Sequence, residues 1–104
     1  MENDRLGMLK QLLQQQPNDA FARYGLAMEH SNRGEVETAL AEFAKLLTAH
    51  PDYTAGYFMA AQTLAKASRV DEAKKMLADG IASAQRTGNG HALSEMEGML
   101  MELG

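Results

Sequence analysis

Residues 17–50 read PNDAFARYGLAMEHSNRGEVETALAEFAKLLTAH, and residues 51–84 read PDYTAGYFMAAQTLAKASRVDEAKKMLADGIASA. The two stretches have the same length and align without a gap. Equivalent positions, 34 residues apart, carry related residues: Asn18 and Asp52, Tyr24 and Phe58, Ala27 and Ala61, Val36 and Val70, Ala39 and Ala73, Phe43 and Leu77, and Leu47 and Ile81. A fixed period of this length is typical of stacked-repeat proteins, in which each unit packs only on its neighbours.

The residues between the repeated positions favour helices and not strands. Apolar residues recur at spacings of three and four, β-branched residues are few, and strict alternation of apolar and polar residues is absent. Pro17 and Pro51 each end a helix, because proline cannot continue one. Gly34 suits the left-handed conformation that follows a helix end. The repeat is therefore expected to consist of helix pairs joined by short turns.

Six helices are predicted, over residues 4–15, from a cap at residue 18 or 19 to residue 32, and over residues 35–49, 53–67, 70–86 and 91–103. Asn18 or Asp19 is expected to cap the second helix and Asp52 the fourth, because a carboxylate or amide oxygen accepts hydrogen bonds from the free N–H groups. The predicted fold class is all-α, an antiparallel helix-pair solenoid. We expect one domain over residues 1–104, with an N-terminal capping helix (1–16), two repeats (17–50 and 51–84) and a C-terminal capping helix (88–103).

The composition excludes several classes of protein. With 10 basic and 14 acidic residues, the formal net charge is −4, whereas non-specific nucleic-acid binding needs a basic patch. Cysteine is absent, which fits a reducing compartment. The N-terminal residues are polar, and no apolar stretch predicts a signal peptide or a membrane span. We therefore expect a cytoplasmic protein that contacts neither nucleic acid nor membrane.

The helix pairs and their period resemble the tetratricopeptide repeat. Residues matching the family pattern are Leu26, Ala27, Gly34, Ala39, Phe43 and Pro51 in the first repeat, and Tyr57, Ala61, Ala73, Leu77 and Gly80 in the second. The chain departs from the pattern at Arg23, His30, Ser68 and Gln85. The resemblance extends over nearly the whole chain, and small stand-alone bacterial repeat proteins are also similar to it. It implies a role in protein–protein interaction.

In such a stack the first helix of each pair lines a concave groove, and the resemblance thereby implies candidate partner-binding residues. They are Phe21, Tyr24, Met28, Asn32, Phe58, Gln62, Lys66 and Met96. One interpretation is an apolar groove that accepts a partner helix or an extended peptide, with aromatic anchors and adaptable methionines. The other is a groove partly filled by these side chains as they pack on neighbouring helices. Some family members bind a terminal carboxylate through Lys, Asn and Arg, and this chain lacks that cluster.

No residue pattern indicates catalysis, a cofactor or a metal. Nucleophile elbows and phosphate-binding glycine loops are absent from the sequence. His30, His50 and His91 each lack a second histidine or a cysteine one helical turn away. We therefore predict a non-enzymatic binding module with no cofactor and no metal.

Self-association is the main alternative to peptide binding. Met96, Met99 and Met101 fall on more than one face of the last predicted helix. One of these faces is then left for a second molecule, and open helical stacks associate through their ends. The alternative function is a homodimer formed through the C-terminal helix or the groove.

Overall fold

A computed structural model describes residues 4–104, which form six helices. They are α1 (Asp4–Gln15), α2 (Ala20–Asn32), α3 (Val36–Ala49), α4 (Thr54–Lys66), α5 (Val70–Thr87) and α6 (Gly90–Leu103). Their bounds lie close to the predicted ones, and the described chain contains no strand. None of these helices has the length and apolar character that a membrane span requires. The expected all-α solenoid is confirmed.

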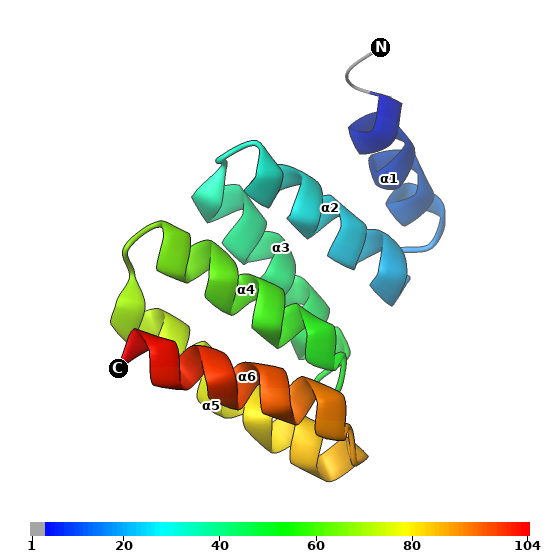
Figure 1. Ribbon diagram of the computed structural model, residues 1–104. Helices are drawn as coiled ribbons and strands as arrows, with labels where there is room; N and C mark the ends of the chain where they lie inside the picture. The colour runs from blue at the N-terminus through cyan, green and yellow to red at the C-terminus, as the bar shows by residue number, and fades with distance from the viewer. Residues whose placement is uncertain (1–3) are drawn as a thin grey trace.

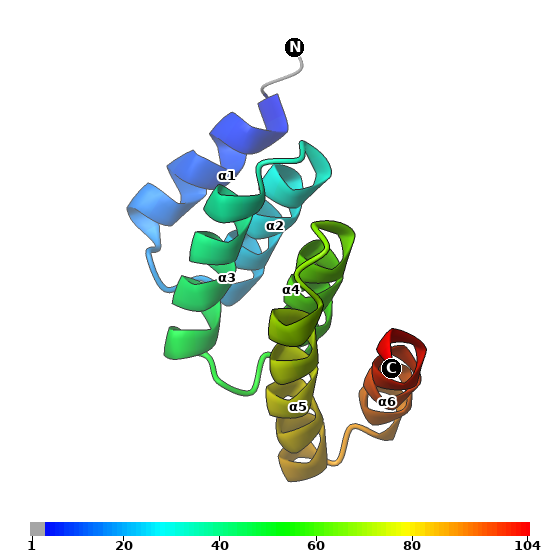
Figure 2. The same cartoon turned by 90° about the vertical axis from the view of Figure 1, so that its left-hand side faces the viewer.

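The helices are arranged in two layers. In Figure 1, α2, α4 and α6 lie in front, with α3 and α5 behind them. Figure 2 shows the same layers from the side. Helix α4 contacts α2 on one side and α6 on the other, and α1 packs on α2 at the far end of the stack. The front layer therefore presents three roughly aligned helices of the type that lines the groove.

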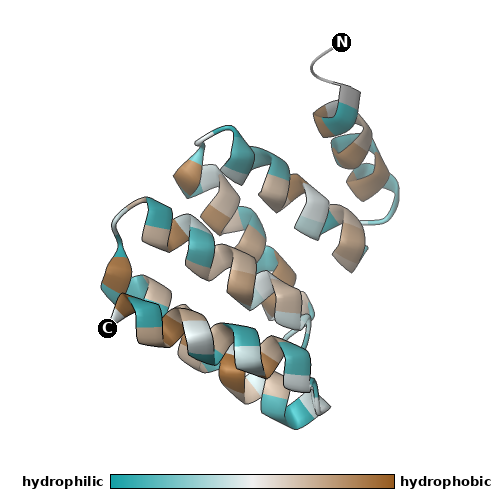
Figure 3. Cartoon of the chain, in the orientation of Figure 1, coloured by the Kyte–Doolittle hydropathy of each residue, from teal (hydrophilic) through white to brown (hydrophobic). Residues whose placement is uncertain are grey.

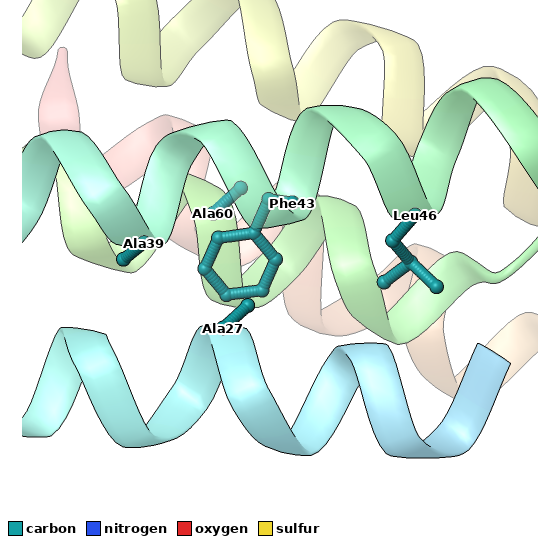
Figure 4. Packing of buried hydrophobic residues seen from close by; sticks show 5 residues of the cluster. All are labelled: Ala27, Ala39, Phe43, Leu46 and Ala60. Atoms are coloured by element: carbon teal, nitrogen blue, oxygen red, sulfur yellow. The ribbon is translucent and has the colours of Figure 1, made fainter. Parts of the chain in front are cut away.

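Each helix is amphipathic, and Phe43 occupies the centre of the first core cluster. Brown and teal segments alternate along the helices in Figure 3, as expected when one stripe of each helix is buried. Figure 4 shows the Phe43 ring pointing from α3 toward Ala27 of α2, with Ala39 and Leu46 beside it. Ala27, Ala39 and Leu46 are completely buried. The small residues let the helix backbones approach the aromatic ring closely, which explains their recurrence in the sequence.

The turns within the two repeats have the same backbone conformation. Gly34 has φ of 77° and Ser68 has φ of 63°, both in the left-handed region. Equivalent hydrogen bonds close both turns. The Glu35 N–H donates to the His30 carbonyl oxygen, and the Arg69 N–H donates to the Leu64 carbonyl oxygen. Serine therefore adopts the conformation that glycine provides in the first repeat, at the steric cost of its Cβ atom.

Two helices of the front layer begin with a side-chain cap. Asp19 Oδ1 accepts a hydrogen bond of 3.0 Å from the Ala22 N–H at the start of α2. Asn89 Oδ1 accepts one of 3.1 Å from the Ala92 N–H at the start of α6. These bonds satisfy N–H groups that have no partner within the helix.

The prediction that Asp52 caps α4 was wrong. The residue at the N-cap is Tyr53, and it makes no side-chain capping bond. The repeat explains this, because Tyr53 and not Asp52 is the equivalent of Asp19. Asp52 instead accepts hydrogen bonds from Arg86 Nη2 at 2.6 Å and from Ser83 Oγ at 3.2 Å. It joins the start of the second repeat to the end of α5.

The two end helices cover the apolar faces of the stack. Helix α1 contributes the buried Leu13, which packs with Ala22 and Leu26 of α2. Helix α6 contributes Met96, which is completely buried against Tyr57 and Leu77. A terminal repeat would otherwise expose such a face to water.

Candidate functional site

Two neighbouring cavities lie between α4 and α6 and form the candidate site. The first, about 310 Å³, is lined by Tyr24, Thr54, Ala55, Phe58, Met59, Asn89, His91, Ala92 and Glu95. The second, about 340 Å³, is lined by Phe58, Gln62, Ser94, Glu95, Gly98, Met99 and Glu102. Because Phe58 and Glu95 line both cavities, we treat them as one feature, the α4–α6 groove.

The α4 wall of the groove is largely apolar. Phe58 and Met59 are half-buried, so each packs on a core cluster while keeping part of its side chain accessible. Tyr24 reaches the first cavity from α2, and its ring lies 5.4 Å from the ring of Tyr53, with the planes inclined at 46°. Burial raises the pKa of the Tyr24 hydroxyl.

The α6 wall is set by a shift in the repeat. Asn89 caps α6 as Asp19 caps α2. Asn89 lies 70 residues after Asp19, two more than twice the 34-residue period. The extra residues are in the Gly88–Gly90 break, where Gly88 has φ of 67°. The shift turns a different set of α6 side chains toward α4 than an uninterrupted register would. Those lining the cavities include His91, Ser94, Glu95, Gly98 and Glu102.

The prediction for Met96 is corrected by this register. Its side chain has no exposed surface and belongs to the core with Tyr57 and Leu77. A Cβ atom placed on Gly80 of α5 would lie 2.5 Å from Met96 Sδ, so the thioether occupies the space that this glycine leaves. Met96 is therefore a packing residue and is not accessible to a partner.

The other predicted residues are divided between the groove and its surroundings. Phe58 lines both cavities, Tyr24 the first and Gln62 the second. Met28 is half-buried and packs against the Phe43 cluster. Three more are exposed but line neither cavity: Phe21, Asn32 and Lys66. Of these, Phe21 is 75% exposed, a large value for an aromatic ring.

Carboxylates dominate the charge of the groove. Glu95 and Glu102 line it, and none of the described residues that line its two cavities is lysine or arginine. His91 is the basic side chain on the lining, with Nε2 lying 3.5 Å from Glu95 Oε1. Sequence reasoning missed both glutamates. The equivalence of Asn89 and Asp19 as caps would have found Glu102, which lies the same 70 residues after Asn32.

The remaining histidines have structural partners. His30 is buried, and its Nδ1 lies 2.7 Å from Glu35 Oε1. This hydrogen bond holds the pKa of the Glu35 carboxyl below its usual value. His50 Nε2 lies 2.9 Å from the carbonyl oxygen of Asn18. Residues 4–104 contain no group of three metal-ligating side chains.

Comparison with known proteins agrees with this architecture. The sequence pattern of the tetratricopeptide repeat matches residues 32–96. A tetratricopeptide repeat domain protein from Salinibacter ruber, solved by NMR, is 33% identical, with a TM-score of 0.78, over 84% of this chain and 88% of that one. None of the curated proteins matches the chain.

Two more distant structures share the fold. A protein from Bordetella parapertussis is 21% identical, with a TM-score of 0.82, over 94% of this chain and 85% of its own. YrrB, described as a tetratricopeptide repeat protein with an unusual peptide-binding site, is 23% identical, with a TM-score of 0.76, over 88% of this chain and 46% of its own. The matched repeats and the identity to the Salinibacter protein show that this chain belongs to the tetratricopeptide repeat family.

Proposed function

We propose that this protein is a non-enzymatic interaction module that binds a peptide or a partner helix in the α4–α6 groove. The observation that carries the proposal is the pair of cavities that meet at Phe58 on the front layer of the stack. Tetratricopeptide repeat proteins are interaction modules, and one structural neighbour, YrrB, is described as having a peptide-binding site. Phe58 and Tyr24 are aromatic anchors of the kind that dominate binding energy at interfaces.

The size of the groove favours a short segment of chain. Each cavity, at about 310 and 340 Å³, is at the small end of the range of roughly 300–1,000 Å³ for ligand pockets. The lining of α6 runs from His91 to Glu102, which is about 16 Å of helix at 1.5 Å per residue. An extended peptide covers that length with about five residues, at 3.3 Å each.

Gly98 offers a way to block the groove without disturbing the fold. Phe58 and Tyr24 also pack on core clusters, so truncating either would change stability and binding together. A Cβ atom added to Gly98 would meet nothing within 4 Å, and the residue lines the second cavity. Gly98→Gln therefore places a side chain in the groove, and it replaces a poor helix former with a good one.

The test is a selection from a random dodecamer phage library on the wild-type protein. Binding of the selected peptides is then compared by fluorescence polarisation with Gly98→Gln and with Gly7→Gln, a matched change on α1, where a Cβ atom also meets nothing within 4 Å. We expect Gly98→Gln to weaken binding at least tenfold and Gly7→Gln to leave it unchanged. A selection that gives no peptides, or peptides insensitive to Gly98→Gln, would refute a peptide site in this groove.

Self-association is a second candidate function, supported by apolar residues exposed on the end helices. On α6, Met101 is 82% exposed, and on α1, Met8 and Leu12 are 67% and 37% exposed. A second copy that buries Met101 would form the homodimer through the C-terminal helix. Molar mass measured by light scattering over a wide concentration range tests this. A dimer that Met101→Gln converts to monomer supports the candidate, whereas a monomer at every concentration eliminates it.

A further inference from the structure

We infer that the segment bound in the α4–α6 groove is cationic and apolar, with two lysine or arginine residues flanking an apolar anchor. This inference rests on the proposed function and specifies its partner. It combines the apolar α4 wall with the two carboxylates on the α6 wall. The anchor would contact Phe58 and Met59, and the basic side chains would meet Glu95 and Glu102.

The carboxylates are accessible and lack a basic partner from α4. Glu95 and Glu102 are both exposed, and Glu95 lies at the junction of the two cavities. The contact that Glu95 makes with His91 is long, at 3.5 Å, and involves a side chain on its own helix. An incoming ammonium or guanidinium group would therefore not have to displace a strong ion pair.

The nearby lysines do not neutralise the negative charge of Glu95 and Glu102. Lys66 of α4 is exposed and lines neither cavity. Lys74 of α5 donates a hydrogen bond of 2.9 Å to the carbonyl oxygen of Gly104, at the end of α6. The formal net charge of the whole chain is −4, which also favours the approach of a cationic segment. An acidic peptide would place like charges together, which disfavours it.

The positions of the two glutamates predict the spacing of the basic residues. Glu95 and Glu102 lie two helical turns apart on the same wall, a rise of about 10 Å. An extended chain covers this distance in about three residues. We therefore expect basic residues three or four positions apart in the bound segment, with an apolar residue between them.

The peptides selected on the wild-type protein test the inference directly. Among the peptides that bind the Gly98→Gln variant more weakly than the wild type, we expect lysine and arginine to be enriched over the unselected library. These basic residues should lie three or four positions apart, with an apolar residue between them. Groove-dependent peptides without this enrichment would overturn the inference and leave the proposed function standing. A selection with no groove-dependent peptide would overturn both.

Charge variants of the protein supply the second measurement. We expect Glu95→Gln combined with Glu102→Gln to weaken binding of a selected peptide about three- to tenfold, the range for two exposed ion pairs. Glu97→Gln is the matched control, because Glu97 is an exposed glutamate of the same helix that lines neither cavity. Equal affinities for the wild type and the double variant, or an equal loss with Glu97→Gln, would overturn the inference.

Discussion

Two helical glycines illustrate how one residue type serves opposite purposes in this fold. Gly80 of α5 is buried, and a Cβ atom there would lie 2.5 Å from Met96 Sδ and 2.6 Å from Tyr57 Cβ. Gly98 of α6 is exposed, and a Cβ atom there would meet nothing within 4 Å. The first glycine permits the close approach of three helices, and the second leaves room in the groove.

Alanine at these two positions should therefore change stability in opposite directions. We expect Gly80→Ala to lower the free energy of unfolding by about 1–3 kcal/mol, because Tyr57 Cβ is next to the backbone and cannot move aside. Gly98→Ala should raise it by roughly 0.5–1 kcal/mol, the ordinary gain from glycine to alanine within a helix. Urea denaturation of both variants measures the difference. A gain in stability from Gly80→Ala would contradict the packing described around Met96.

The left-handed turns allow a reciprocal exchange. Ser68 holds φ of 63°, a conformation that costs a residue with a Cβ atom about 1–2 kcal/mol. We expect Ser68→Gly to stabilise the protein by roughly 0.5–1 kcal/mol. The gain is smaller than the strain removed, because glycine also raises the conformational entropy of the unfolded chain. Gly34→Ser, made at φ of 77° in the first repeat, should destabilise it by a similar amount. Melting temperatures of the two variants that shift in the same direction would argue against this account.

At the scale of elements, the helices could be predicted from the sequence because their ends carry local signals. Pro17 and Pro51 stop two helices, and Gly34 makes a turn, so these boundaries depend on residues close in the chain. The orientation of α6 could not be obtained in this way. It depends on the two extra residues in the Gly88–Gly90 break, and the importance of those residues becomes visible only when Asn89 is recognised as the cap.

That orientation predicts different roles for two methionines of α6. Met96 is completely buried against Tyr57 and Leu77, whereas Met101 is 82% exposed. We expect Met96→Ala to lower the free energy of unfolding by about 2–4 kcal/mol, because it removes a buried side chain and leaves a cavity. Met101→Ala should change it by less than about 0.5 kcal/mol. Equal effects in urea denaturation would show that α6 has a different register on α5.

At the scale of the whole molecule, polar contacts join positions about one repeat apart. Arg69 Nη1 donates to Glu37 at 2.5 Å, Ser31 Oγ and Thr63 Oγ1 lie 2.7 Å apart, and Arg86 Nη2 donates to Asp52 at 2.6 Å. None of these pairs could be predicted from periodicity alone, because the repeat is recognised by its apolar positions, and Asp52 and Arg69 lie just before α4 and α5. The apolar pattern therefore indicates which helices stack. The Arg69 and Ser31 contacts tie the first repeat to the second, and the Arg86 contact ties the start of the second repeat to the end of α5.

The Asp52 contact makes part of the stability depend on pH. The Arg86 guanidinium, with help from Ser83 Oγ, holds the pKa of the Asp52 carboxyl below its usual value. A carboxyl with a lowered pKa in the folded state stabilises the fold fully above the ordinary aspartate pKa of about 3.9. The contribution is lost as the pH falls through the lowered pKa, because the unfolded chain takes up the proton first.

Asp52→Asn should therefore lower the melting temperature at neutral pH and have a smaller effect near pH 3. The charge is absent from the variant at every pH, whereas the wild type loses it only in acid. Asp79→Asn serves as the control, because Asp79 is an exposed aspartate of α5 with no ion pair among the described contacts. Its melting temperature should stay close to that of the wild type at neutral pH. If the difference between wild type and Asp52→Asn stayed constant from neutral pH to pH 3, the Arg86 contact would not stabilise the junction between the start of the second repeat and the end of α5.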